Sequence, residues 1–222
     1  MARKHDAKEP KNPLLIYTCN EIERLYFLQM RRDCRYANIT VIQKSPQAVN
    51  LELMVKEAIK RRREEGFATV CCVINPKDLE IQQELLTAQL ELAERRKVKI
   101  IFNQPGIEFW FHLHFGMPAE KTMNRTQLSE GIKDWVEEYR STGKFFSEDE
   151  GSQFFLRLFP NKSEAVIRAN EYKLLIEDVP FGAPAGMATN MPSFLKAIND
   201  ECGRCYVSRG QFYEKHRVKY DI

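Results

Sequence analysis

The fold of this chain is decided by the stretch Lys99-Ile-Ile-Phe-Asn-Gln-Pro-Gly-Ile-Glu-Phe-Trp-Phe-His-Leu-His-Phe115. Residues 98–102 form a short apolar and β-branched run with the length of a buried strand. The Asn-Gln-Pro-Gly that follows ends this strand, and an aromatic segment with helical spacing comes next. Glu108 stands in the first turn of that helix. In an open α/β sheet, functional sites lie at such points, just beyond the carboxyl end of a strand.

Three similar units precede this stretch. Apolar runs at 14–19, 37–42 and 67–74 predict three strands, and amphipathic segments at about 21–30, 48–65 and 79–96 predict the helices between them. Alternating strands and helices with short connections predict a four-stranded parallel α/β sheet flanked by helices. Within it we expect Asn20 to cap the first helix, Ser45-Pro46 to begin the second and Gly66 to end it.

The pattern changes after residue 117, where helices follow one another without strands. Four segments there predict helices, at 126–140, 149–159, 163–175 and 193–201. We therefore expect a solvated lead-in (1–12), an α/β domain (13–117), a C-terminal helical portion packed on it (118–205) and a tail (206–222).

Composition and charge set few limits on function. The 222 residues include 34 basic and 31 acidic ones, a net charge of +3 that neither requires nor excludes nucleic acid. The apolar runs fall well short of the roughly 20 residues of a membrane span. The first residues contain no apolar segment of the kind a secretion signal needs. The sequence thus predicts a cytoplasmic protein without a membrane partner.

Three local features favour structural roles. Cys202-Gly-Arg-Cys205 is the only C-x-x-C and has no second ligand pair, so a turn is favoured over a zinc or redox site. The basic run Lys60-Arg-Arg-Arg63 closes a predicted helix, where cations are favoured by the helix dipole. His112 and His114 are two residues apart and cannot chelate a metal together from one helix face, so we expect packed histidines.

Carboxylates follow three of the four predicted strands, namely Glu21, Glu23, Asp78, Glu80 and Glu108. Magnesium is usually held by one or two carboxylates and waters, and a two-metal phosphodiester site needs several acids together. The alternative is that acids in first helical turns only complement the helix dipole. The chain has no glycine-rich phosphate loop and no G-x-S-x-G elbow.

The segment from Asn103 to Phe115 resembles the S-N-P-x-F-E-x-W-x-x-x-H-F signature of RloB-like proteins. That family occurs beside restriction-modification genes and includes a phage abortive-infection protein. Glu23-Arg-Leu-Tyr-Phe27 looks like the family's T-E-x-x-Y-F helix start, and segments 165–170 and 189–198 look like elements near its end. The resemblance covers roughly residues 14–200.

The resemblance implies a Toprim-like core, in which a glutamate after the first strand and a D-x-D after the third hold magnesium for phosphodiester chemistry. This sequence departs from the family at those positions, which are occupied by Thr18, Asn75 and Lys77. A lysine ammonium cannot ligate magnesium. Other family positions are matched, by Glu23, Asn103, Pro105, Glu108, Trp110 and His114.

Two functions therefore remain open, besides a plain protein-binding scaffold. In the first, catalysis is lost and the chain is a nucleic-acid-binding or partner-binding subunit in bacterial defence, without a cofactor and, by family analogy, beside an ATPase. Lys77 and Asn103 would then contact the ligand, Lys77 by holding phosphate as a point charge.

The second function is a divergent magnesium-dependent nuclease. Its metal ligands would be Asp78 and Glu80, and its catalytic residues Glu23, Glu108 and His114. The two functions differ in whether these carboxylates converge within about 5 Å, since magnesium lies about 2 Å from each ligand oxygen.

Overall fold

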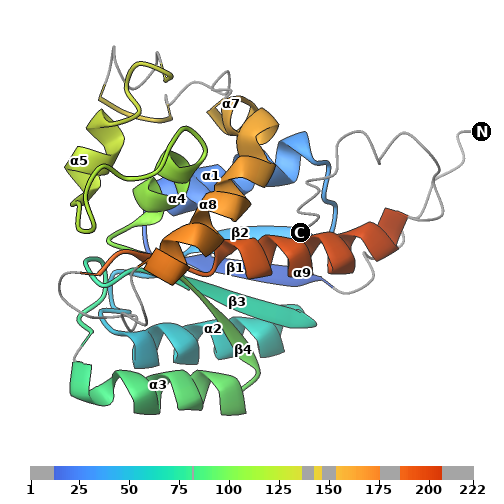
Figure 1. The fold of residues 1–222 in the computed structure, drawn as a ribbon. Helices are drawn as coiled ribbons and strands as arrows, with labels where there is room; N and C mark the ends of the chain where they lie inside the picture. The colour runs from blue at the N-terminus through green and yellow to red at the C-terminus, as the bar shows by residue number, and fades with distance from the viewer. Residues whose placement is uncertain (1–12, 82, 137–142, 147–153, 176–185, 207–222) are drawn as a thin grey trace, which may run out of the picture.

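A five-stranded sheet forms the centre of the molecule, with strand order β2-β1-β3-β4-β5 (Figure 1). The computed structural model describes residues 13–81, 83–136, 143–146, 154–175 and 186–206. The strands are β1 (Leu14–Thr18), β2 (Ile39–Gln43), β3 (Thr69–Ile74), β4 (Val98–Gln104) and β5 (Ala188–Thr189). The predicted α/β class and the four parallel strands are confirmed.

The fifth strand was absent from the sequence prediction. β5 pairs antiparallel with the end of β4, Asn103 opposite Thr189 and Gln104 opposite Ala188. Asn190 fixes this edge, because its side chain accepts from the Phe102 amide at 2.9 Å and donates to the Ile100 carbonyl at 3.0 Å. Two residues are too few to show strand periodicity, so only the tertiary contact defines this strand.

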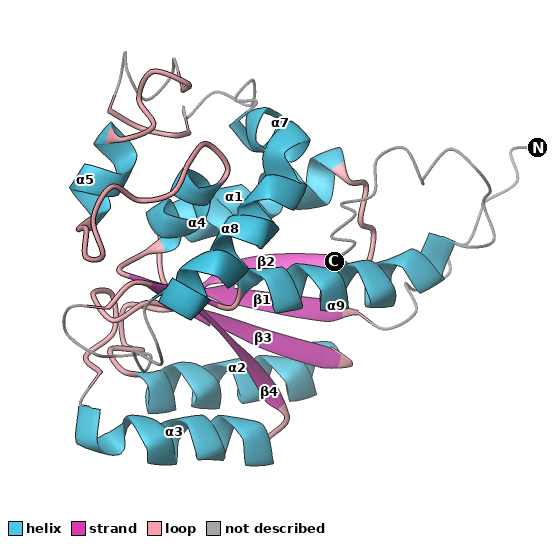
Figure 2. Cartoon of the chain, viewed as in Figure 1, coloured by secondary structure: helices cyan, strands magenta, loops and turns pink. Residues whose placement is uncertain are grey.

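Helices cover both faces of the sheet (Figure 2). They are α1 (Glu21–Asp33), α2 (Leu51–Glu65), α3 (Gln83–Arg95), α4 (Ile107–Leu113), α5 (Arg125–Glu130), α7 (Phe154–Leu158), α8 (Lys162–Leu175) and α9 (Met191–Tyr206), with a 3₁₀ turn at Phe159–Asn161. One hydrophobic core lies between the sheet and α2 and α3. The other is larger, and in it residues of α1, α4, α7, α8 and α9 pack together. No described helix is both long and apolar enough to cross a membrane.

The helix ends agree with the predictions at two positions and differ at a third. Asn20 caps α1 by accepting from the Glu23 amide at 2.9 Å, and Gly66 ends α2 with φ +73°. The predicted start at Ser45-Pro46 is wrong. α2 begins at Leu51 with Asn50 as its cap, because the Ser45 hydroxyl instead donates to Glu57.

The second half also differs from its prediction in detail. α5 ends at Glu130 and is followed by turns, so the predicted helix 126–140 is too long within its described part. α9 continues to Tyr206, which places Cys202 and Cys205 in a helix and not in a turn. The predicted lead-in 1–12, the residues after 206 and the start of the predicted helix 149–159 lie outside the described residues.

Candidate functional site

The candidate site lies where the chain reverses its direction of winding. β1 has β2 on one side and β3 on the other, so the connections that leave the carboxyl ends of β1 and β3 pass to opposite faces of the sheet. Such a switch point opens a crevice in parallel α/β sheets. Here it brings together Cys19–Glu23 after β1 and Asn75–Asp78 after β3, with the start of α4 after β4 next to them.

Glu23 lies at the bottom of this crevice and is fully buried. Its Oε2 accepts from the Cys19 amide at 2.9 Å, and its Oε1 accepts from Asn75 Nδ2 at 3.1 Å. Burial raises the pKa of the Glu23 carboxyl to about 8 even though these two donors favour its charged form. Burial of Glu23 thus favours the neutral form of its carboxyl group.

Asn75 connects the acidic side chains of the crevice. Its Oδ1 accepts from the Lys77 and Asp78 amides, both at 3.0 Å, which fixes the turn after β3. Its Nδ2 donates to Asp78 at 2.7 Å as well as to Glu23. Asn20 also donates to the same Asp78 oxygen. An amide thus joins two carboxyl groups at a position where the family resemblance implies a third acid.

A cation from a distant part of the chain completes the cluster. Arg125, the first residue of α5, donates to Glu108 Oε1 from Nε at 2.9 Å and from Nη2 at 2.7 Å. Its Nη1 lies 3.6 Å from Asp78 Oδ2. The Glu108 side chain is only 4% exposed and that of Arg125 is 22% exposed. A guanidinium therefore lies between two carboxylates that the sequence assigns to catalysis and metal binding.

Glu108 keeps one acceptor that is not satisfied. Its Oε2 is buried and has no hydrogen-bond partner among the described residues. This oxygen is 2.3 Å from the position that a Cβ on Gly106 would take. Glycine at residue 106 thus leaves the space that the carboxylate occupies, and the buried Oε2 stays without a donor from the described residues.

A cleft of about 800 Å³ opens above the cluster, between α1, the start of α4, α5 and residues 143–146. The charged side chains in its lining are the cations Arg24, Lys77, Arg125 and Lys144 and the acids Glu21 and Glu108. Lys77 is exposed and forms no ion pair with the described residues. The excess of cations in the described lining favours a ligand with negative charge.

Two candidate residues from the sequence lie apart from this cluster, and a third serves the sheet edge. Glu80 is exposed, and its backbone amide donates to the Val49 carbonyl. His114 is buried with its ring 4.7 Å from that of Trp110, and burial lowers its pKa to about 4. Asn103 is buried at the β4–β5 edge, where its Oδ1 accepts from Thr189 at 2.7 Å.

The magnesium implied by the family resemblance does not fit these side chains. Nitrogen atoms of Asn75 and Arg125 point at the carboxylate oxygens that a metal would need, and Lys77 follows at the turn. In the described ranges, no three acidic, histidine or cysteine side chains are grouped closely enough to hold a metal ion. Sequence reasoning did not identify Arg125, which follows Glu108 by 17 residues and belongs to no motif.

Comparison with known proteins gives one finding. The family model described as RloB-like protein matches residues 14–198, the same span as the resemblance inferred from the sequence. No curated protein and no solved structure gives a significant match.

Proposed function

The chain belongs to the RloB-like family, and we propose that it is a non-cleaving, nucleic-acid-binding subunit of a cytoplasmic bacterial system that defends against phage or foreign DNA. The observation that carries this proposal is the guanidinium of Arg125 between Glu108 and Asp78. Because the protein supplies this positive charge itself, the carboxylates hold an arginine in the cleft in place of a metal. The cluster then serves binding and not phosphodiester cleavage.

The chemistry of the cleft fits a phosphodiester ligand. Lys77 stands at the cleft without an ion pair to the described residues and can hold a phosphate as a point charge. Arg125 is already fixed by Glu108, so its remaining N–H groups are presented to a ligand without further loss of rotamer freedom. The volume of about 800 Å³ is typical of a small-ligand site.

The family resemblance supports the biological setting of this proposal. Proteins of this family occur beside restriction-modification genes, and by analogy an ATPase would be the companion subunit. Such a companion subunit would supply the catalytic activity, because the cluster around Arg125 does not favour phosphodiester cleavage.

Fluorescence anisotropy with labelled single-stranded and double-stranded DNA and RNA oligonucleotides tests the proposal. We expect salt-dependent binding by the native chain and at least about a tenfold loss of affinity in Lys77→Glu, which corresponds to about 1.4 kcal/mol. Lys173→Glu is the matched control, because Lys173 is exposed on α8 and does not line the cleft. Equal losses in both variants, or no binding of any oligonucleotide at low salt, would contradict a nucleic-acid site here.

The same oligonucleotides incubated with magnesium or manganese test the absence of cleavage. We expect intact substrates on a denaturing gel. Metal-dependent cleavage that disappears in Glu108→Gln would overturn the proposal and support the divergent nuclease, with Glu108 as the catalytic residue that the sequence predicts.

A further inference from the structure

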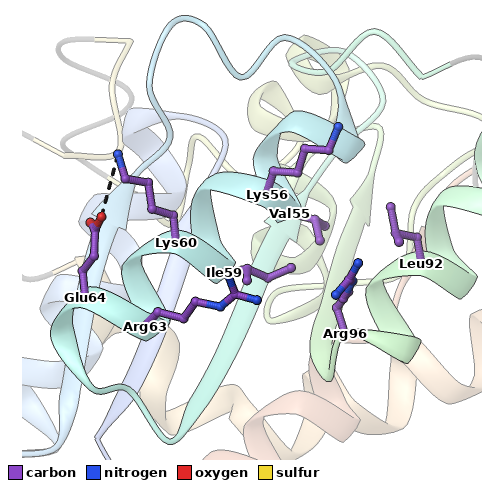
Figure 3. A pocket seen from close by; sticks show the side chains of 8 residues that line it. All are labelled: Val55, Lys56, Ile59, Lys60, Arg63, Glu64, Leu92 and Arg96. Atoms are coloured by element: carbon purple, nitrogen blue, oxygen red, sulfur yellow. Dashed lines mark ion pairs between the residues drawn. The ribbon is translucent and has the colours of Figure 1, made fainter.

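A second concave surface lies between α2 and α3, on the face of the sheet opposite to α1 and α8 (Figures 1 and 3). This groove has a volume of about 500 Å³. It is lined by Val55, Lys56, Ile59, Lys60, Arg63, Glu64, Leu92 and Arg96. None of these residues belongs to the candidate site, so the groove is an independent feature of the fold.

Helical spacing gives the groove two unlike ends. On α2, Leu53 is followed at i+3, i+7 and i+10 by Lys56, Lys60 and Arg63, which share one side of the helix. On α3, Leu85 is followed at i+7 by Leu92, in line with Arg96. Both helices connect parallel strands of one sheet and therefore run in the same direction. Leu53 and Leu85 thus lie in the first turns of the two helices. Lys60, Arg63 and Arg96 lie toward their last turns, and Lys56 lies one turn after Leu53.

The apolar side chains at the first end are exposed although they are large. Leu53 is 38% exposed and Leu85 is 47% exposed. Between them and the cationic end, Ile59 and Leu92 are half-buried, and Val55 lies beneath. A phosphate backbone gains nothing from such an apolar floor, whereas an amphipathic peptide gains binding free energy by burying its own apolar side chains against it.

The cations that line the groove are only weakly compensated. Lys56 pairs with Glu52 at 2.6 Å and Lys60 with Glu64 at 3.8 Å, both exposed pairs that contribute little. The guanidinium groups of Arg63 and Arg96 have no ion pair or hydrogen bond with described residues. Figure 3 shows that Arg63 extends across Ile59 toward Arg96. The rim of the groove is therefore complementary to carboxylates.

We propose that the groove between α2 and α3 binds an acidic amphipathic helix of a partner protein. Its apolar side chains, spaced i, i+4 and i+7, lie over Ile59 and Leu92 and reach toward the exposed leucines. Its carboxylates pair with Arg63 and Arg96, where bidentate contact with a guanidinium is the strongest available. The bound helix then packs across α2 and α3.

A displayed library of roughly 18-residue helical peptides, about five turns, tests this proposal. Leucine is fixed at the i, i+4 and i+7 positions, and the flanking positions vary among glutamate, lysine and glutamine. We expect glutamate to be enriched among the peptides that bind the native chain. Selected peptides should bind the Arg63→Glu/Arg96→Glu variant at least about tenfold more weakly. The variant Lys121→Glu/Lys173→Glu has the same change in charge away from the groove and should bind normally.

Three results would overturn the proposal. They are a library without binders, binders enriched in lysine, and acidic binders that tolerate the reversal at Arg63 and Arg96. Loss of oligonucleotide binding in that reversed variant would instead make the groove a nucleic-acid surface. Because Lys77 and the candidate cleft are unchanged in these variants, failure here leaves the proposed function of the cleft untouched.

Discussion

Replacing Arg125 with leucine tests whether this guanidinium holds the candidate site together. In the native protein it provides both hydrogen bonds of Glu108 Oε1, at 2.9 and 2.7 Å. Glu108 Oε2 has no partner among the described residues. The variant would therefore leave a carboxylate that is 4% exposed without a cation and without a donor.

The expected loss of stability can be estimated from this geometry. Removing one partner of a buried ion pair typically costs about 3–5 kcal/mol, because the remaining charge stays buried without compensation. The Arg125 side chain is 22% exposed, so water can partly replace it, and we expect a loss near the lower end, about 3 kcal/mol. In Arg125→Leu/Glu108→Leu neither charge remains, and the coupling between the two substitutions should be about 2 kcal/mol.

Urea denaturation at pH 7 of the native chain, both single variants and the double variant measures this coupling. For a chain of this length, 3 kcal/mol corresponds to a fall in Tm of roughly 6–12 °C. Arg24→Leu is the control, because its pair with Glu21 is exposed and should contribute less than about 1 kcal/mol. The role assigned to the guanidinium would be refuted if the stability losses of the two single variants simply added up in the double variant. It would also be refuted if Arg125→Leu lost no more stability than the control.

Three further predictions concern burial at and near the site. Because the pKa of Glu23 is raised to about 8, the folded chain binds more protons than the unfolded chain above pH 4.5. The free energy of unfolding should therefore fall by about 2 kcal/mol from pH 6.5 to 8. Urea titrations of Glu23→Gln should show no such pH dependence. The pKa of His114 is lowered to about 4, so the unfolded chain binds more protons at this residue than the folded chain does. The stability of the fold should therefore rise from pH 4 to 6.5. Calorimetric Tm values of His114→Gln should lack this part of the pH dependence. Gly106→Ala would place a Cβ 2.3 Å from Glu108 Oε2 and should lower the unfolding free energy by about 1–3 kcal/mol, whereas Gly116→Ala, with nothing within 4 Å, should not.

The sheet could be predicted from the sequence because its parallel strands are buried on both faces. Runs such as 69–74 are then continuously apolar, a signal that depends on no distant residue. The start of α2 could not be predicted in the same way. Ser45 and Asn50 both have side chains that can cap a helix. The choice between them depends on Glu57 in the second turn of α2, which accepts a hydrogen bond from the Ser45 hydroxyl.

At the site, too, some residues can be predicted from the local sequence and others depend on distant contacts. Glu23, Asp78 and Glu108 follow strands whose carboxyl ends must meet at one edge, so their approach to one another follows from strand order. Nothing local distinguishes Arg125 from other cations at helix starts. It reaches Glu108 only because α5 packs against α4, with the Leu128 carbonyl 3.0 Å from His112 Nδ1.

The acids of this cluster are compatible with a folded protein only because each has gained a donor from the chain. A buried carboxylate without a donor or a cation is strongly destabilising. Asn75 has an amide NH2 group where an aspartate has a second carboxylate oxygen. That group donates to Glu23 and Asp78 together, whereas a third carboxylate would offer neither of them a donor. Arg125 does the same for Glu108. Asn75 and Arg125 therefore act in the same way, because each supplies N–H donors to acids of this cluster, and the described lining of the cleft keeps an excess of cations.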